Sequence, residues 1–213
     1  MPIQPATTAL AIVDAQNGFL DGPHGELPAP GGLAAIPRIV GLAEHLIRRE
    51  RDAGRGLVVA ACGDEHREDC PEFTGPDAPW PRHCVAGTVG AELEERIAPL
   101  VTEDAGGRWF FGKGRTNDDI EYSMTRGHDD AGRGIVDRAR AAGITAFVVT
   151  GYVTNVCVLA TVLDLRAAGF EVLVYTPGVV GIPGGDGLPT PDEAIAQMAA
   201  AGADIADSVA AVA

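Results

Sequence analysis

Short apolar runs alternate along this chain with longer segments of helical spacing, and this alternation is the feature that most restricts its fold. Thr8 to Asp14, Gly56 to Asp64 and Ile144 to Thr150 are apolar almost throughout, whereas Leu33 to Gly54 has leucines and isoleucines at helical spacing. Strands that are buried on both faces read as continuous apolar runs, and helices between them connect parallel neighbours. The pattern therefore predicts a parallel sheet that is covered by helices.

The rest of the chain continues the pattern. Further strands are expected at Trp109 to Lys113, Glu171 to Thr176 and Ala203 to Ala206, and further helices at 90–100, 131–143, 155–169 and 191–202. Since crossovers between parallel strands are right-handed, the prediction is an α/β, doubly wound, Rossmann-like sheet with helices on both faces. No composition break or internal repeat divides the 213 residues, so we expect a single domain over 1–213.

Charge and composition disfavour several classes of partner. The formal net charge is −14, which disfavours nucleic acid and anionic membranes. No apolar run approaches the roughly 20 residues of a membrane span, and the first residues do not resemble a signal peptide. The four cysteines form no CxxC pair and are expected to be free thiols in a reducing cytoplasm. We therefore expect a cytoplasmic protein with a small-molecule substrate. The sequence leaves open whether the protein forms a homo-oligomer.

Polar residues end several of the predicted strands. Asp14, Asp64 and Lys113 each follow or close an apolar run, and a turn after another run leads to Cys157. In open parallel sheets, ligands bind beyond the carboxyl ends of the strands, where these side chains would meet. Taken singly, an acid after a strand is most often a helix cap, so the convergence is what suggests a functional site.

Cys157 lies where the chain is expected to turn from strand to helix. We expect Thr154 or Asn155 to cap that helix, which would place Cys157 in its first turn. Free backbone N–H groups and the helix dipole would there lower the pKa of the thiol and could hold an oxyanion. The alternative interpretation is an inert cysteine packed under the sheet. This segment alone leaves both interpretations open.

A group of potential metal ligands begins at the end of one predicted strand. Its members are Asp64, His66, Glu72 and His83. Asp64 and His66 are two residues apart, so their side chains are expected on one face. Two imidazoles with one or two carboxylates suit zinc, iron or manganese better than calcium or magnesium. The alternative is a solvated loop with surface histidines, and Cys70 and Cys84 would be competing soft ligands.

Several segments of the chain together resemble a known family. They are ALAIVDAQNGF, DEH, WPRHCVAGTVGAEL, FFGKG, EYS and GYVTNVCVLAT, and they resemble the nicotinamidase and pyrazinamidase branch of the isochorismatase-like cysteine hydrolases. The resemblance runs from about residue 8 to residue 179 in the family's order, and WPRHCVAGTVGAEL is its most specific part. It implies a six-stranded parallel sheet and conversion of nicotinamide to nicotinate and ammonia through a thioester.

The resemblance also implies roles for individual residues. It assigns Asp14, Lys113 and Cys157 to a catalytic triad. It places the family's cis peptide bond between Tyr152 and Val153, where the Val153 N–H would join that of Cys157 in holding the oxyanion.

For the metal, the resemblance implies one divalent transition ion, with zinc favoured over iron and manganese. Asp64, His66 and His83 fall on family ligands, and Glu72 stands where the fourth ligand is commonly a histidine. A glutamate can bind the same metals, so this difference changes the charge of the site and does not remove a ligand.

Aromatic residues are implied in the substrate pocket. Phe19 and Trp80 match residues that hold the pyridine ring between them, and Tyr122 matches a residue of the pocket wall. The chain departs from the family pattern at Gly18, Asn155 and Tyr175, and its glycine- and proline-rich segment 180–190, expected to be a surface loop, is longer than the resemblance implies.

Two other functions stay open at this point. One is a related amidase that acts on a different amide or lactam, which the departures from the pattern would allow. The other is a catalytically silent domain used for binding or assembly, which would have no need of Asp14, Lys113 and Cys157 together.

Overall fold

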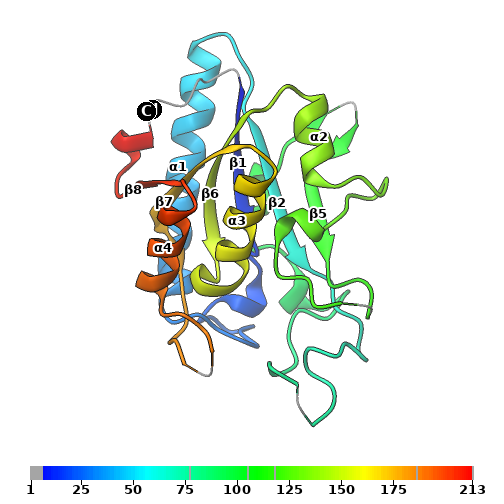
Figure 1. Cartoon of the computed structure of the whole chain (residues 1–213). Helices are drawn as coiled ribbons and strands as arrows, with labels where there is room; N and C mark the ends of the chain where they lie inside the picture. The colour runs from blue at the N-terminus through cyan, green and yellow to red at the C-terminus, as the bar shows by residue number, and fades with distance from the viewer. Residues whose placement is uncertain (1–6, 77, 105, 118, 186, 213) are drawn as a thin grey trace.

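The computed structural model, which describes residues 7–76, 78–104, 106–117, 119–185 and 187–212, contains a six-stranded parallel sheet (Figure 1). The strand order is β5-β2-β1-β6-β7-β8. The strands are β1 (Thr8–Val13), β2 (Val58–Asp64), β5 (Phe110–Lys113), β6 (Ala146–Tyr152), β7 (Glu171–Val180) and β8 (Asp204–Ala206). The α/β, doubly wound sheet predicted from the apolar runs is confirmed.

The order of the strands reverses between β1 and β6. The strands that follow β1 in the chain, β2 and β5, lie on one side of it, and β6, β7 and β8 lie on the other. Every residue of β1 is buried, which explains its uninterrupted apolar sequence. In doubly wound sheets, such a reversal opens a crevice at the carboxyl ends of the strands, and ligands bind there.

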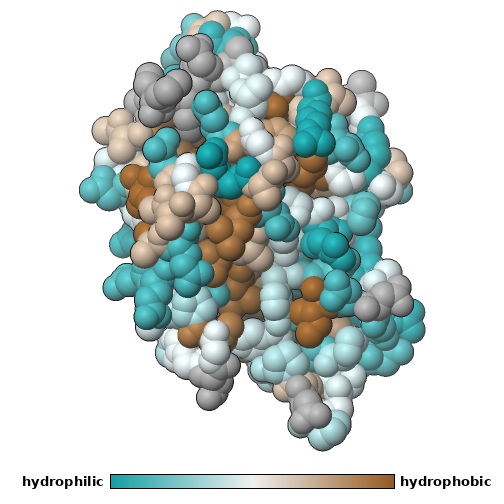
Figure 2. Space-filling model, viewed as in Figure 1, coloured by the Kyte–Doolittle hydropathy of each residue, from teal (hydrophilic) through white to brown (hydrophobic). Residues whose placement is uncertain are grey.

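Helices cover both faces of the sheet (Figure 1). Helix α1 (Gly32–Asp52) lies on one face, and α3 (Leu159–Ala167) and α4 (Pro191–Ala200) lie on the other. Helix α2 (Ile135–Ala141) precedes β6. On the face seen in Figure 2, apolar side chains gather over α3, with polar ones on either side. None of the helices within the described residues is long and apolar enough to cross a membrane.

One predicted helix is wrong. The segment 90–100 forms only two short 3₁₀ turns, Val89–Ala91 and Ala98–Leu100. Its backbone is bonded instead to the chain that follows β1, since Asn17 donates to the Glu92 carbonyl at 2.9 Å and Glu94 donates to the Ala15 carbonyl at 2.9 Å. Tertiary pairing has therefore overridden the local helical pattern. The antiparallel pairing of two short strands, β3 (Glu103–Asp104) and β4 (Gly107–Arg108), was not predicted.

Candidate active site

Three polar side chains meet at the carboxyl edge of the sheet because of the strand register. Asp64 and Lys113 are directly paired residues at the ends of β2 and β5. Asp14 follows β1 immediately and has a φ of 46°. This is the left-handed region, which aspartate tolerates better than most residues. All three side chains are buried, so the sheet brings charged groups together in a place with almost no water.

Lys113 lies at the centre of this group. Its Nζ is 3.0 Å from Oδ2 of Asp14, contacts Oδ1 of Asp64, and lies 3.8 Å from Sγ of Cys157. It is the chain's only lysine, and the other cationic side chains that the composition counts are arginines. The predicted triad of Asp14, Lys113 and Cys157 is thus brought together around one ammonium group.

The charges of this group set each other's pKa values. Burial raises the pKa of Asp14, although the nearby Lys113 ammonium opposes the shift. Burial would also raise the pKa of Asp64, but Lys113 and His66 outweigh it and hold that carboxyl below its usual range. Burial alone would lower the pKa of Lys113, and the two carboxylates instead raise it well above its usual value. The ammonium is therefore charged throughout the physiological range.

Cys157 is positioned by a turn between β6 and α3. The peptide bond between Tyr152 and Val153 is cis, and the π-helical turn Thr154–Val158 follows it directly. The expected capping by Thr154 or Asn155 is wrong, because Val153 is the N-cap and no side chain bonds there. Cys157 nevertheless lies in the first turn after the strand, as predicted.

The expected fall in the pKa of Cys157 is also wrong. Burial raises the pKa of this thiol well above its usual value, and the negative charges of Asp14 and Asp64 add to the shift. Lys113 acts in the opposite direction without overcoming it. The direction of the pKa shift depends on the burial of the sulfur and on the charges around it. The position of Cys157 at the start of a helix does not reveal either. The resting thiol is neutral and needs a base to become a nucleophile.

Asp64 joins Lys113 to the other predicted metal ligands, since its Oδ1 contacts Lys113 and its Oδ2 faces His66 and His83. His66 follows the end of β2, and the returning chain forms a parallel bridge between His66 and Val85. In that bridge the His66 N–H donates to the Cys84 carbonyl at 3.1 Å, and the Ala86 N–H donates to the His66 carbonyl at 2.9 Å. This pairing carries His83 back beside His66, although the two are far apart in sequence.

The ligand atoms of Asp64, His66 and His83 lie close to one another, and Glu72 lies beside His66. The Nε2 atoms of His66 and His83 lie 3.7 and 3.9 Å from Oδ2 of Asp64, and Oε2 of Glu72 lies 4.0 Å from Nε2 of His66. Asp64, His66 and His83 each offer an atom within 4.8 Å of the others, whereas Glu72 groups with His66 and Cys70. Such separations are too long for hydrogen bonds and close to the roughly 3.4 Å between ligands of one tetrahedral ion.

The second nitrogen of each histidine is already engaged. Nδ1 of His83 lies 2.8 Å from the Pro81 carbonyl, and Nδ1 of His66 lies 3.4 Å from Sγ of Cys70. Nε2 of His66 is buried without a hydrogen-bond partner. Metal-binding histidines are typically oriented in this way by a contact to the other nitrogen. The residues therefore fit a divalent transition metal ion.

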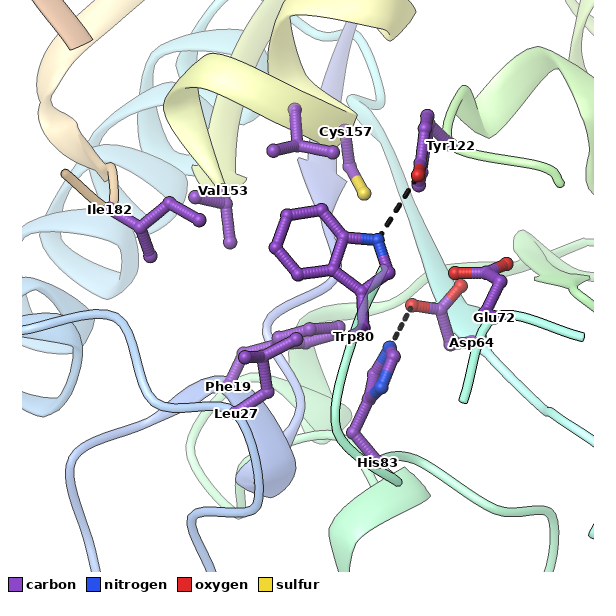
Figure 3. A pocket seen from close by; sticks show the side chains of 11 residues that line it. Phe19, Leu27, Asp64, Glu72, Trp80, His83, Tyr122, Val153, Cys157 and Ile182 are labelled. Carbon is purple, nitrogen blue, oxygen red and sulfur yellow. Dashed lines mark hydrogen bonds and ion pairs between the residues drawn. The ribbon is translucent and has the colours of Figure 1, made fainter. Parts of the chain in front are cut away.

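A pocket lined by Asp64, Glu72, His83 and Cys157 opens at this edge of the sheet. The three predicted aromatic residues, Phe19, Trp80 and Tyr122, all line it (Figure 3). Nε1 of Trp80 donates to the Tyr122 hydroxyl at 3.1 Å. The apolar part of the lining is completed by Leu27, Val153, Val156 and Ile182. The pocket suits a flat, largely apolar ligand.

Some contributing residues were not predicted from the sequence. The Gln16 amide donates to the Asp64 and Ala91 carbonyls at 2.8 and 2.7 Å and accepts from the Asp64 N–H at 2.8 Å, which joins the ends of β1 and β2. The Cys62 thiol donates to Oδ1 of Asp14 at 3.1 Å. Gln16 lies within the ALAIVDAQNGF motif, so its position was a signal; nothing in the sequence pointed to Cys62 or Ile182.

The chain is similar to proteins of one known family. The isochorismatase domain family matches residues 8–209. The nicotinamidase/pyrazinamidase of Mycobacterium tuberculosis is 32% identical, with 82% of this chain and 87% of the relative covered. The nicotinamidase of Escherichia coli is 32% identical, with 92% and 93% covered. The zinc complex of the Pyrococcus horikoshii pyrazinamidase superposes with a TM-score of 0.73 and is 31% identical, with 95% of this chain and 99% of that one covered.

Proposed function

This chain belongs to the isochorismatase domain family, and on that premise we propose that it is a metal-containing cysteine amidohydrolase that converts nicotinamide to nicotinate and ammonia. The relatives named nicotinamidase and pyrazinamidase support this substrate, since this chain matches most of the length of each. The observation that carries the proposal is the position of Lys113. One buried ammonium contacts the candidate base Asp14, lies 3.8 Å from the candidate nucleophile Cys157 and touches Asp64 of the metal cluster.

The first step is activation of the thiol. Because burial keeps the Cys157 thiol protonated by raising its pKa, the attack needs a base. Burial also raises the pKa of Asp14, which makes its carboxylate a stronger base than an exposed one. Asp14 takes the thiol proton, and Lys113 stabilises the thiolate that forms.

The thiolate then attacks the carboxamide carbon. The N–H groups of Val153 and Cys157 hold the oxyanion of the tetrahedral intermediate, and one such donor is worth about 3–4 kcal/mol. Protonated Asp14 gives its proton to the departing ammonia, leaving a thioester on Cys157. Water hydrolyses the thioester with Asp14 again as base, which releases nicotinate and restores the thiol.

We assign the metal to Asp64, His66 and His83, with Glu72 as a fourth ligand. Zinc is the preferred ion, because two imidazoles and carboxylates suit it and because the Pyrococcus horikoshii relative is a zinc complex. When bound, the ion supplies a Lewis acid that can take up a ring nitrogen and orient the substrate.

Phe19 and Trp80 provide flat apolar surfaces for the pyridine ring. Tyr122 fixes Trp80 through the hydrogen bond to its indole nitrogen, at 3.1 Å. The compartment is proposed to be the reducing cytoplasm, since the four cysteines are all free and buried.

The test is ammonia release from nicotinamide by the purified, metal-loaded protein, with Cys157→Ala as the matched control. Turnover by the wild type and none by the variant is the expected result. A wild type that leaves nicotinamide intact while Cys157 still reacts with iodoacetamide would overturn the substrate and leave a related amidase for another amide or lactam.

A further inference from the structure

The glycine- and proline-rich segment 180–190 was expected to be a surface loop, yet one of its residues lines the pocket. Ile182 faces the same space as Cys157 and Val153 (Figure 3). It is partly buried against the hydrophobic core. The loop therefore contributes a side chain to the place where the substrate is expected.

A single side chain beside the nucleophile holds this loop. Nδ2 of Asn155 donates to the carbonyls of Ile182 at 3.1 Å and Pro189 at 2.8 Å, and Oδ1 of Asn155 accepts from the Ile182 N–H at 3.1 Å. Asn155 is only 2% exposed. One buried amide thus ties both ends of the loop to the turn that carries Cys157.

Described residues of the loop also contact one another. Gly185 and Leu188 exchange backbone hydrogen bonds at 3.0 and 2.9 Å. A Cβ on Gly181 would lie 2.6 Å from Pro191 and 2.9 Å from Oδ1 of Asn155, so the chain packs against the amide too closely for a side chain. Thr190 and Glu193 form a capping box at the start of α4.

We propose that Ile182, held in place by Asn155, is a specificity-determining residue that excludes substrates with substituents on the ring edge facing the loop. The proposal rests on the proposed function for the identity of the ring, and its site is the pocket already described. The Ile182 side chain, which we call the wall, is apolar and held in place. It therefore favours an unsubstituted aromatic amide and rejects one with an added alkyl group by steric overlap.

Asn155 is suited to this role by having both a donor and an acceptor. An aspartate of the same shape would keep the acceptor for the Ile182 N–H. It would place a carboxylate oxygen against the two carbonyl oxygens that the amide now binds, and the loop would lose both of these bonds. Asn155→Asp is therefore an isosteric way to release the wall without truncating it.

The first experiment compares kcat/KM for nicotinamide and for its ring-methylated isomers in wild type, Ile182→Ala and Asn155→Asp. We expect both variants to raise the ratio of at least one methylated isomer to nicotinamide by about tenfold or more, since one methyl group in a tight pocket is worth this much. Ile205→Ala, a matched truncation at a residue 40% exposed on β8, is expected to leave the ratio unchanged.

The second experiment does not depend on the substrate. Cys157 is alkylated with iodoacetamide and with N-benzyl iodoacetamide, and the two rates are measured by mass spectrometry of the Cys157 peptide. The Cys157 thiolate attacks the same iodomethyl carbon in both reagents. The ratio of the two alkylation rates therefore does not depend on the fraction of thiolate. We expect the alkylation rate of N-benzyl iodoacetamide, relative to that of iodoacetamide, to rise about tenfold in Ile182→Ala and Asn155→Asp.

The outcomes separate the two proposals. If nicotinamide is a substrate but neither ratio changes in the variants, Ile182 does not define the pocket and this inference is wrong. If the wild type does not hydrolyse nicotinamide but the alkylation ratio rises in both variants, the wall is supported and the proposed substrate is wrong. If Ile182→Ala responds and Asn155→Asp does not, Asn155 does not hold the wall, and that part is overturned.

Discussion

The Cys62 thiol donates a hydrogen bond to Oδ1 of Asp14 at 3.1 Å, and both side chains are fully buried. The other carboxylate oxygen, Oδ2, lies 3.0 Å from the Lys113 ammonium. Each oxygen of the candidate base therefore faces a different donor, one on the neighbouring strand β2 and the other at the end of β5, which lies beyond β2. The thiol of Cys62 itself keeps a raised pKa, because burial and the charge of Asp14 both disfavour its ionisation, so it acts as a donor and not as a second nucleophile.

This contact leads to a prediction for Cys62→Ala and Cys62→Ser. Burial raises the pKa of Asp14, while the bonds from Lys113 and Cys62 lower it. Removing the thiol donor should raise the pKa further, so Asp14 stays protonated to higher pH. The acid limb of the kcat/KM profile should then move to higher pH in Cys62→Ala and stay near wild type in Cys62→Ser, which keeps a donor. Identical limbs in all three proteins would show that Cys62 does not act on Asp14.

Cys157→Ala should abolish turnover while leaving the fold intact. The change removes one buried sulfur, so we expect the melting temperature to move by no more than about 5 °C. The rate should fall by about 10³-fold or more, because Cys157 is the only thiol among the described residues that line the pocket. Ammonia release and thermal melting measured on the same preparation check this, and residual activity of a few per cent would contradict the role of Cys157.

Lys113→Met should raise the pKa of Cys157. Lys113 is the main group that lowers this pKa against the effect of burial, so its removal leaves burial and the carboxylates unopposed. The profile of the Cys157 alkylation rate against pH should shift to higher pH in the variant. The loss of transition-state stabilisation, calculated from the fall in turnover, should be much larger than the loss in the free energy of unfolding. Because two buried carboxylates lose their counterion, a melting curve must accompany each profile. An alkylation profile that does not move would mean that Lys113 does not affect the pKa of the Cys157 thiol.

The sequence predicted most of the sheet, because fully buried strands such as β1 read as unbroken apolar runs. It also predicted that Asp14, Asp64 and Lys113 would meet, since parallel strands end at one edge. It did not predict the segment 90–100, where pairing with the chain after β1 decides the conformation. Helical spacing is a local signal, whereas that pairing depends on the segment after β1, which is far away in sequence.

The candidate site shows the same division. The positions of the candidate triad and of the four candidate metal ligands follow from motifs, but the pKa of Cys157 depends on how deeply the thiol is buried and on which charges face it. Ile182 lines the pocket because its backbone is hydrogen-bonded to the Asn155 side chain, which is distant in sequence. Such long-range contacts leave no periodicity in the sequence and were therefore missed.

Purified protein should contain about one divalent transition metal ion per chain. Asp64, His66 and His83 converge closely, and the unpartnered, buried Nε2 of His66 needs a ligand or an ion. His66→Ala should lose the metal, and Glu72→Gln should weaken its affinity by a smaller factor. His128→Ala removes an exposed histidine outside the cluster and should retain full occupancy. Elemental analysis after dialysis against a chelator makes the comparison; a chelated, metal-free protein with full activity would exclude a catalytic metal.

Nicotinamide and pyrazinamide should be hydrolysed much faster than benzamide. We expect all three rings to fit between Phe19 and Trp80, which line the pocket with His83, but benzamide has no ring nitrogen to offer the proposed metal ion. A site that sets aside a polar partner for its substrate can reject an analogue lacking that group by about 10⁴-fold. The measurement is kcat/KM for the three amides under one condition. Equal values for benzamide and nicotinamide would show that the ring nitrogen is not recognised, because the apolar walls alone would then account for binding. If all three amides were inert in a protein whose Cys157 still alkylates, the triad would stand, and the substrate would have to be sought among other amides small enough to pass Ile182.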